Sequence, residues 1–93
     1  MKEEREAVIV VIRGEVQGVG FRHAMVRQAR RLSLAGWVRN RSDGSVEAHI
    51  EGAAKEVATL LFWCRQGPPF ASVEDLTVQV TSPCGYSDFF VCF

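Results

Sequence analysis

The spacing of apolar positions changes along this chain, and each change predicts a new element. Residues 7–13 read Ala-Val-Ile-Val-Val-Ile-Arg, an almost continuous β-branched run that predicts a central strand covered on at least one face. From Phe21 to Leu32 the apolar residues follow helical spacing, while Arg27, Arg30 and Arg31 face away from them. This pattern predicts an amphipathic helix of about three turns.

Two alternating segments around an Asp-Gly turn predict a β-hairpin. Residues 36–41 and 45–52 alternate between apolar and polar side chains at period two, and Ser42-Asp43-Gly44 joins them. In the second segment the apolar and polar side chains point to opposite faces, so His49 is expected to face the solvent. The apolar set is Val46, Ala48 and Ile50, and the polar set is Glu47, His49 and Glu51.

Helical spacing returns over residues 57–64 and stops at Gly67-Pro68-Pro69, which predicts a second helix. Residues 76–80 alternate as a fourth strand, and residues 89–93 are expected to form a short edge strand. The order strand, helix, strand, strand, helix, strand predicts an α+β ferredoxin-like βαββαβ sandwich, with two helices on one face of an antiparallel sheet. At this length, residues 1–93 are predicted to form a single domain.

Composition and charge narrow the possible partners. With 47% hydrophobic and 24% charged residues, the chain has the composition of an ordinary globular domain. Its 11 basic and 11 acidic residues balance, so we expect neither nucleic acid nor an anionic membrane as a partner. No apolar run approaches the ~20 residues that cross a bilayer, and residues 1–6 lack the apolar core of a signal peptide.

The three cysteines, Cys64, Cys84 and Cys92, are an odd number without CxxC spacing. They cannot all pair within one chain, and their spacing does not predict a zinc site. Three reduced thiols are typical of a reducing compartment. We therefore expect a cytoplasmic protein, and a monomer.

Glycines crowd the chain between the first strand and the first helix. Gly14, Gly18 and Gly20 permit positive φ angles and close backbone approach, so successive N–H groups can form an anion-binding nest. The loop runs into the start of a helix, where unpaired N–H groups and the positive end of the dipole favour phosphate. Arg22 adds a planar guanidinium that can bind two phosphate oxygens. The spacing fits neither a P-loop nor a dinucleotide fingerprint, because His23 stands where the third glycine would be.

Topology is expected to bring a second polar residue to this loop. A strand-helix-strand unit with a right-handed crossover leaves its two strands parallel, so their ends lie at the same edge of the sheet. The glycine loop follows the first strand, and Asn40 lies near the end of the second. Asparagine is also common before turns, which is the simpler interpretation of Asn40 alone. The topology nevertheless predicts that Asn40 and Arg22 lie at one rim.

Two long segments resemble the signatures of the acylphosphatase family. Residues 14–22, Gly-Glu-Val-Gln-Gly-Val-Gly-Phe-Arg, are similar to the first signature. Residues 36–46, Gly-Trp-Val-Arg-Asn-Arg-Ser-Asp-Gly-Ser-Val, are similar to the second, and the resemblance covers roughly Val8 to Val80. It implies hydrolysis of acyl phosphates to a carboxylate and inorganic phosphate, with no metal, cofactor or covalent intermediate.

The resemblance also implies a role for each site residue. By motif position, Arg22 binds the phosphate and Asn40 orients the attacking water. Arg22 is joined in phosphate binding by the backbone amides of the loop. These belong to Gln17, Gly18, Val19, Gly20, Phe21 and Arg22.

Three other interpretations remain open. An RNA-binding ferredoxin-like module would need aromatic residues on its central strands for base stacking. Residues 46–51 offer none, and Glu47 and Glu51 would repel the RNA phosphates. The acylphosphatase-like domain of hydrogenase-maturation carbamoyltransferases typically has proline where this chain has His23, and zinc-finger cysteines are lacking here, so a free-standing enzyme is expected. A fold that binds an anion without catalysis is the third. We expect His23 to be a surface residue, and Trp37 and Trp63 to serve packing.

Overall fold

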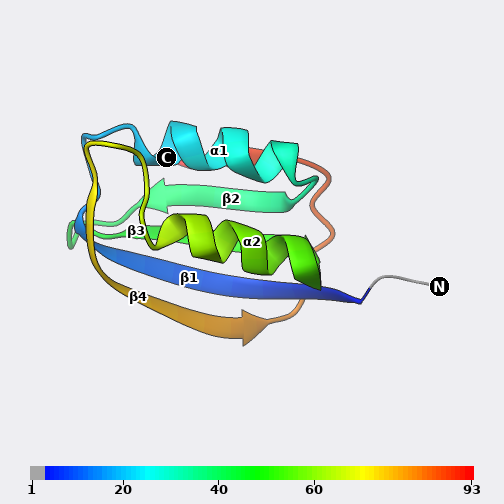
Figure 1. The fold of residues 1–93 in the computed structure, drawn as a ribbon. Helices are drawn as coiled ribbons and strands as arrows, with labels where there is room; N and C mark the ends of the chain where they lie inside the picture. Colours follow the sequence, from blue (N-terminus) through cyan, green and yellow to red (C-terminus); the bar gives the residue numbers. More distant parts are fainter. Residues whose placement is uncertain (1–3) are drawn as a thin grey trace.

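The alternating segments pair into one sheet of five strands, and both helices lie against the same face of it (Figure 1). The computed structural model describes residues 4–93; residues 1–3, part of the stretch in which no signal peptide is expected, lie outside the described residues. The elements follow in chain order. They are β1 (Arg5–Glu15), α1 (Phe21–Arg31), β2 (Ala35–Asn40), β3 (Val46–Ala53), α2 (Ala54–Cys64), β4 (Ser72–Thr81) and β5 (Phe89–Val91).

The sheet has the strand order β4-β1-β3-β2-β5. β1 pairs antiparallel with both β3 and β4, and β2 pairs antiparallel with β3, which confirms the predicted ferredoxin-like sandwich. β5 is the predicted short edge strand, but it pairs parallel with β2, from Gly36 opposite Phe89 to Val38 opposite Val91. The sheet is therefore mixed, since only its first four strands are antiparallel.

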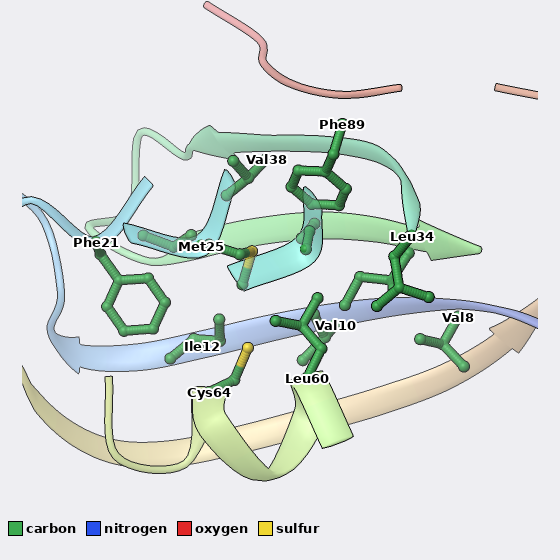
Figure 2. Close-up of a cluster of buried hydrophobic side chains, with 14 of the residues drawn as sticks. Val8, Val10, Ile12, Phe21, Met25, Leu34, Val38, Leu60, Cys64 and Phe89 are labelled. Carbon is green, nitrogen blue, oxygen red and sulfur yellow. The ribbon is translucent and has the colours of Figure 1, made fainter. Parts of the chain in front are cut away.

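The core lies between the sheet and the two helices, and β1 runs through its middle (Figure 2). Val8, Val10 and Ile12 alternate toward the helices and are buried, as a central β-branched strand requires. Met25 of α1 and Cys64 of α2 are buried in the same cluster as these residues. Burial raises the pKa of the Cys64 thiol, which stays protonated and packs as a small apolar group.

The outer face of the sheet, turned away from the helices, is partly covered. The alternation of β3 is as predicted, but the expectation that His49 faces solvent is wrong, because its residue exposure is 3%. The segment 82–87 between β4 and β5 crosses this face, and Tyr86 packs edge-on against the His49 ring with centroids 5.5 Å apart. Trp37 of β2 stacks on the same ring at 6.2 Å. Covering by a distant segment leaves no local pattern in the sequence.

No helix within residues 4–93 is long and apolar enough to span a membrane. Of the two tryptophans, Trp63 packs edge-on against Phe21 with ring centroids 5.4 Å apart, so its expected packing role is confirmed. Trp37 packs too, on His49. His23 is exposed, as expected.

Candidate active site

The glycine loop leaves β1 through an irregularity in the sheet. The register between β1 and β4 shifts at Arg13 and Gly14, where Gly14 has φ 130°. A Cβ atom at Gly14 would lie 2.2 Å from the carbonyl oxygen of Ser72, so only glycine lets the two strands approach here. The shift turns the chain out of the sheet and into the loop.

Two glycines set the geometry of the loop itself. Gly18 has φ 74° and Gly20 has φ 79°, both in the left-handed region that favours glycine. Nothing lies within 4 Å of the position that a Cβ would take at either residue, so there is open space beside the loop. Glycine is therefore required here for its backbone angle and not for lack of room. Gly20 is the residue before α1, and its carbonyl accepts the first helical bond, from the N–H of Ala24 at 3.1 Å.

The start of α1 is arranged to attract an anion. No side chain caps it, and its first turn contains no acidic residue. The first N–H groups of the helix therefore have no acceptor from a cap, and the dipole is not neutralised. Phe21, the first helical residue, buries its ring in the core and thereby fixes the start of the helix to the sheet.

Arg22 lies half-buried in the first turn of α1. Among residues 4–93, no carboxylate oxygen lies within 4.0 Å of the Arg22 guanidinium nitrogens, so Arg22 has no ion pair there. Its guanidinium carbon lies over the Phe93 ring, 5.4 Å from the ring centroid, in a cation–π arrangement. A guanidinium that no carboxylate neutralises, beside free helix N–H groups, is suited to binding phosphate.

Asn40 is the last residue of β2 and pairs with Val46 of β3. α1 packs against β2, and the end of β2 lies on the same side of the molecule as the start of α1 (Figure 1). The expected placement of Asn40 and Arg22 at one rim is therefore what the fold shows. Among the described residues, the Asn40 Oδ1 atom is the buried side-chain oxygen or nitrogen that has no hydrogen-bond partner. Such an acceptor needs a physical explanation, because buried polar groups are nearly always paired.

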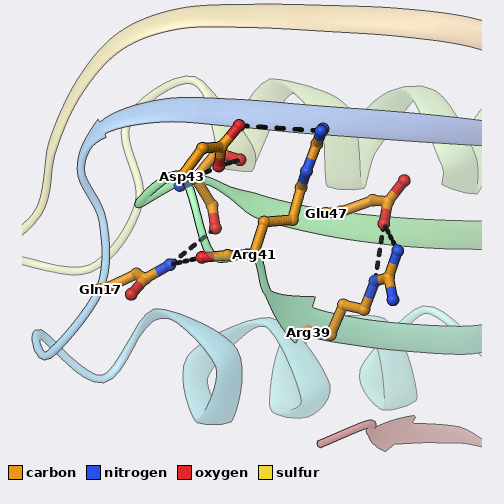
Figure 3. A network of polar contacts seen from close by, with 6 residues as sticks. Gln17, Arg39, Arg41, Asp43 and Glu47 are labelled. Carbon is orange, nitrogen blue, oxygen red and sulfur yellow. Dashed lines mark hydrogen bonds and ion pairs between the residues drawn. The ribbon is translucent and has the colours of Figure 1, made fainter.

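The Gln17 side chain ties the loop to the turn that follows Asn40 (Figure 3). Its Nε2 atom donates to the carbonyl oxygens of Arg41, at 2.7 Å, and Ser45, at 2.9 Å. Both amide hydrogens of Gln17 are thus bound at the two ends of one turn. The turn itself is closed by a 2.8 Å hydrogen bond from the Arg41 N–H to the Ser45 carbonyl. Gln17 links the two halves of the candidate site.

The turn itself is held by Asp43, whose Oδ1 accepts from both the N–H and the hydroxyl of Ser45, at 2.9 and 2.5 Å. These hydrogen bonds, the one from the Ser45 hydroxyl first, lower the pKa of the Asp43 carboxyl, which is therefore an anion at neutral pH. Its Oδ2 lies 3.7 Å from Arg41, and Arg39 pairs with Glu47 at 2.6 Å (Figure 3). Arg39 and Arg41 are thus each paired with a carboxylate, whereas Arg22 has no ion pair among residues 4–93.

A family model for acylphosphatases matches residues 8–91, nearly the whole chain. The chain belongs to the acylphosphatase family. A relative named acylphosphatase from Burkholderia mallei (strain NCTC 10247) is 51% identical over 79 residues, which cover 85% of this chain and 81% of the relative. The crystal structure of the acylphosphatase from Bacillus subtilis superposes with a TM-score of 0.91 at 35% identity, covering 94% of this chain and 98% of that one.

Full-length HypF, in its phosphate- and nucleotide-bound form, superposes with a TM-score of 0.89 at 23% identity. The match covers 100% of this chain and 12% of that one, and it shows a shared fold. As a member of the acylphosphatase family, the chain is a hydrolase.

Sequence reasoning missed the side-chain role of Gln17, for which only the backbone N–H was considered. The two carbonyls that it binds lie 24 and 28 positions away in the chain. The one local signal is a long amide side chain beside glycines, and that signal does not name its partners. Within this acylphosphatase fold, the residues of the first signature contact the second through Gln17.

Proposed function

We propose that this chain hydrolyses acyl phosphates to a carboxylate and inorganic phosphate by direct attack of water, without a metal ion or a covalent intermediate. The backbone N–H groups of residues 17–22 and the guanidinium of Arg22 hold the phosphate. Asn40 orients the water. Family membership supports the overall reaction, and the geometry of the rim supports this division of roles.

The observation that carries the proposal is the buried Oδ1 atom of Asn40, which has no partner within residues 4–93. A carboxamide oxygen accepts hydrogen bonds, so it can hold a water molecule by one of its O–H groups. That contact directs the lone pair of the water oxygen away from Asn40. The attack then occurs on the phosphorus atom of a phosphate held at the start of α1.

The chemistry of an acyl phosphate explains why so few groups suffice. The leaving group is a carboxylate whose conjugate acid has a pKa of about 4, so it departs without a proton donor. Phosphoryl transfer depends mainly on positioning and on stabilising charge over the equatorial oxygens. Helix N–H groups and Arg22 provide that charge stabilisation, and Asn40 provides positioning.

We also propose that the enzyme acts as a monomer in the cytoplasm. The loop, Arg22 and Asn40 all come from one chain, so a second copy is not required to complete the site. The three thiols are free cysteines, which suits a reducing compartment.

Hydrolysis of benzoyl phosphate in the presence of a metal chelator tests the mechanism. The wild-type chain should turn over, and Asn40→Ala should lower kcat by at least about 100-fold while largely sparing inhibition by inorganic phosphate. Arg22→Ala should weaken phosphate inhibition by at least about tenfold, because a charge-assisted pair of hydrogen bonds is lost. Arg27→Ala, an exposed arginine farther along α1, is the matched control and should change neither.

Three results would contradict the proposal. Strict metal dependence would remove the direct water attack. An Asn40→Ala variant that loses phosphate binding but keeps turnover would show that the two roles are misassigned. Phosphate binding without any turnover by the wild type would favour a site that only holds an anion.

A further inference from the structure

A second cluster of reactive side chains lies on the outer face of the sheet, away from the candidate active site. His49 and Glu51 are neighbours on the same side of β3, with exposures of 3% and 2%. Their side chains meet, with 2.7 Å between His49 Nε2 and Glu51 Oε1. Buried carboxylates and imidazoles on an outer sheet face are rare and call for partners.

Those partners come from the segment between β4 and β5. The backbone N–H of Cys84 donates to Glu51 Oε1 at 2.8 Å, and the N–H of Gly85 donates to Glu51 Oε2 at 2.9 Å. Burial alone raises the pKa of the Glu51 carboxyl, but these hydrogen bonds and the one to His49 outweigh it and leave that pKa below its ordinary value. Glu51 is thus an anion whose position is fixed.

The side chain of Cys84 completes the cluster. A His49 nitrogen, a Glu51 oxygen and the Cys84 sulfur all lie within 4.8 Å of one another. In a tetrahedral zinc site, bonds of 2.0 to 2.3 Å place ligand atoms about 3.3 to 3.7 Å apart, so shifts of about 1 Å or less would bring these three atoms to ligand positions. We propose that His49, Glu51 and Cys84 form a binding site for one Zn²⁺ ion.

The donor set and its surroundings favour this cation. Imidazole nitrogen and thiolate sulfur suit zinc, whereas magnesium and calcium prefer oxygen ligands alone. The His49 ring is already oriented between Trp37 and Tyr86, and the Glu51 carboxylate is already held by backbone N–H groups. Zinc sites commonly have such a second layer of contacts, which orients the ligands.

The site opens to solvent at Cys84, which is exposed, while His49 and Glu51 form its buried floor. Three protein ligands therefore bind the ion, and water takes the fourth position. The ligands come from β3 and from a segment more than thirty residues later, which explains why cysteine spacing did not predict the site.

The consequence is a link between β3 and the segment that leads into β5. At present Glu51 holds this segment through two hydrogen bonds. A bound Zn²⁺ adds a coordinate bond from Cys84. The unfolded chain has no preformed site in which this bond could form. Because the ion binds the folded chain preferentially, it should raise thermal stability.

Titration of the full chain with Zn²⁺ and Co²⁺, in the presence of a phosphine reductant, tests the site. We expect one Zn²⁺ per chain, and for Co²⁺ a thiolate-to-metal charge-transfer band in the near ultraviolet. Saturating Zn²⁺ should raise the midpoint of thermal unfolding by at least about 5 °C. Cys84→Ser changes an exposed side chain, so it keeps the fold and should abolish the band and weaken Zn²⁺ binding at least tenfold.

Cys92→Ser is the matched control, because Cys92 is the other thiol near β5 and does not belong to the cluster. It should leave the band, the affinity and the thermal shift unchanged. No charge-transfer band in the wild type, or a band that Cys84→Ser retains, would overturn the site. These readouts do not involve hydrolysis, so the zinc site and the proposed reaction stand or fall separately.

Discussion

At the scale of single residues, the two halves of the candidate active site depend on one amide. The phosphate loop and the turn after Asn40 are separate segments, and the turn is closed by its own backbone hydrogen bonds between Arg41, Gly44 and Ser45. Gln17 joins them with two hydrogen bonds, both from the same nitrogen. Because Arg41 directly follows Asn40, a shift of the Arg41 carbonyl would move the amide that we propose orients the water relative to the proposed phosphate site.

Gln17→Ala should therefore lower kcat by about 10- to 100-fold, since a displacement of about 1 Å in a catalytic group has effects of this size. Inhibition by inorganic phosphate should change less than about threefold, because the loop N–H groups and Arg22 remain. Gln17→Glu should be at least as damaging, because a carboxylate cannot donate to the two carbonyls. Steady-state kinetics on benzoyl phosphate provide the measurement.

A double-mutant cycle separates positioning from a general loss of structure. If Gln17 acts through Asn40, then Gln17→Ala should add less than about a twofold effect in the Asn40→Ala background. Gln28→Ala, at another half-buried glutamine, is the control and should leave kcat unchanged. Additive effects in the cycle would show that Gln17 does not work through Asn40.

At the scale of elements, the turn that follows α1 contains an unusual residue, Ser33. Ser33 has φ 56°, the one positive φ outside glycine among residues 4–93. The backbone around it forms the two bonds of a Schellman motif, from the Leu34 N–H to the Ala29 carbonyl at 2.9 Å and from the Ser33 N–H to the Arg30 carbonyl at 3.1 Å. Glycine usually takes this position, because a side chain in the left-handed region costs about 1–2 kcal/mol.

Ser33→Gly should therefore raise the free energy of unfolding by up to about 1 kcal/mol. This net gain allows for the greater conformational entropy that glycine has in the unfolded chain. Urea denaturation followed by circular dichroism measures the change. Ser33→Ala retains the unfavourable φ and should give no gain. Ser33 lies at the end of α1 far from the phosphate loop, so kcat should not change in either variant, and a loss of stability in Ser33→Gly would disprove the argument.

Most helices and strands were predictable because their sequence signals are local. The β-branched run of β1, the spacing of α1 and the Asp-Gly turn each report on residues a few positions apart, and the structure confirms them within about two residues. The glycine loop and Arg22 were proposed as a phosphate site on local signals of the same kind. The Gln17 contacts, the burial of His49 and the direction of β5 depend on segments 24 or more positions away, so no spacing rule could predict them.

At the scale of the whole molecule, β5 is short but firmly attached. Its three residues pair with β2, and the Gly36 N–H donates to the Asp88 carbonyl at 2.9 Å. Phe89 has 0% exposure and belongs to the same buried core cluster as Leu34 and Val38 (Figure 2). The Arg30–Asp88 ion pair at 3.1 Å is exposed, so it contributes little, and Phe89 is the main attachment of the last strand.

Phe89→Ala should therefore destabilise the whole domain rather than release β5 alone. Removing a fully buried phenylalanine costs about 3–5 kcal/mol, a large share of the 5–15 kcal/mol that stabilises a typical domain. Urea unfolding should remain a single transition, with tryptophan fluorescence and circular dichroism giving the same midpoint. Phe93→Ala is the matched control: the Phe93 residue is 99% exposed, and its loss should change stability by less than about 0.5 kcal/mol. A cost below about 1 kcal/mol for Phe89→Ala, or two separate transitions, would show that β5 folds independently of the core.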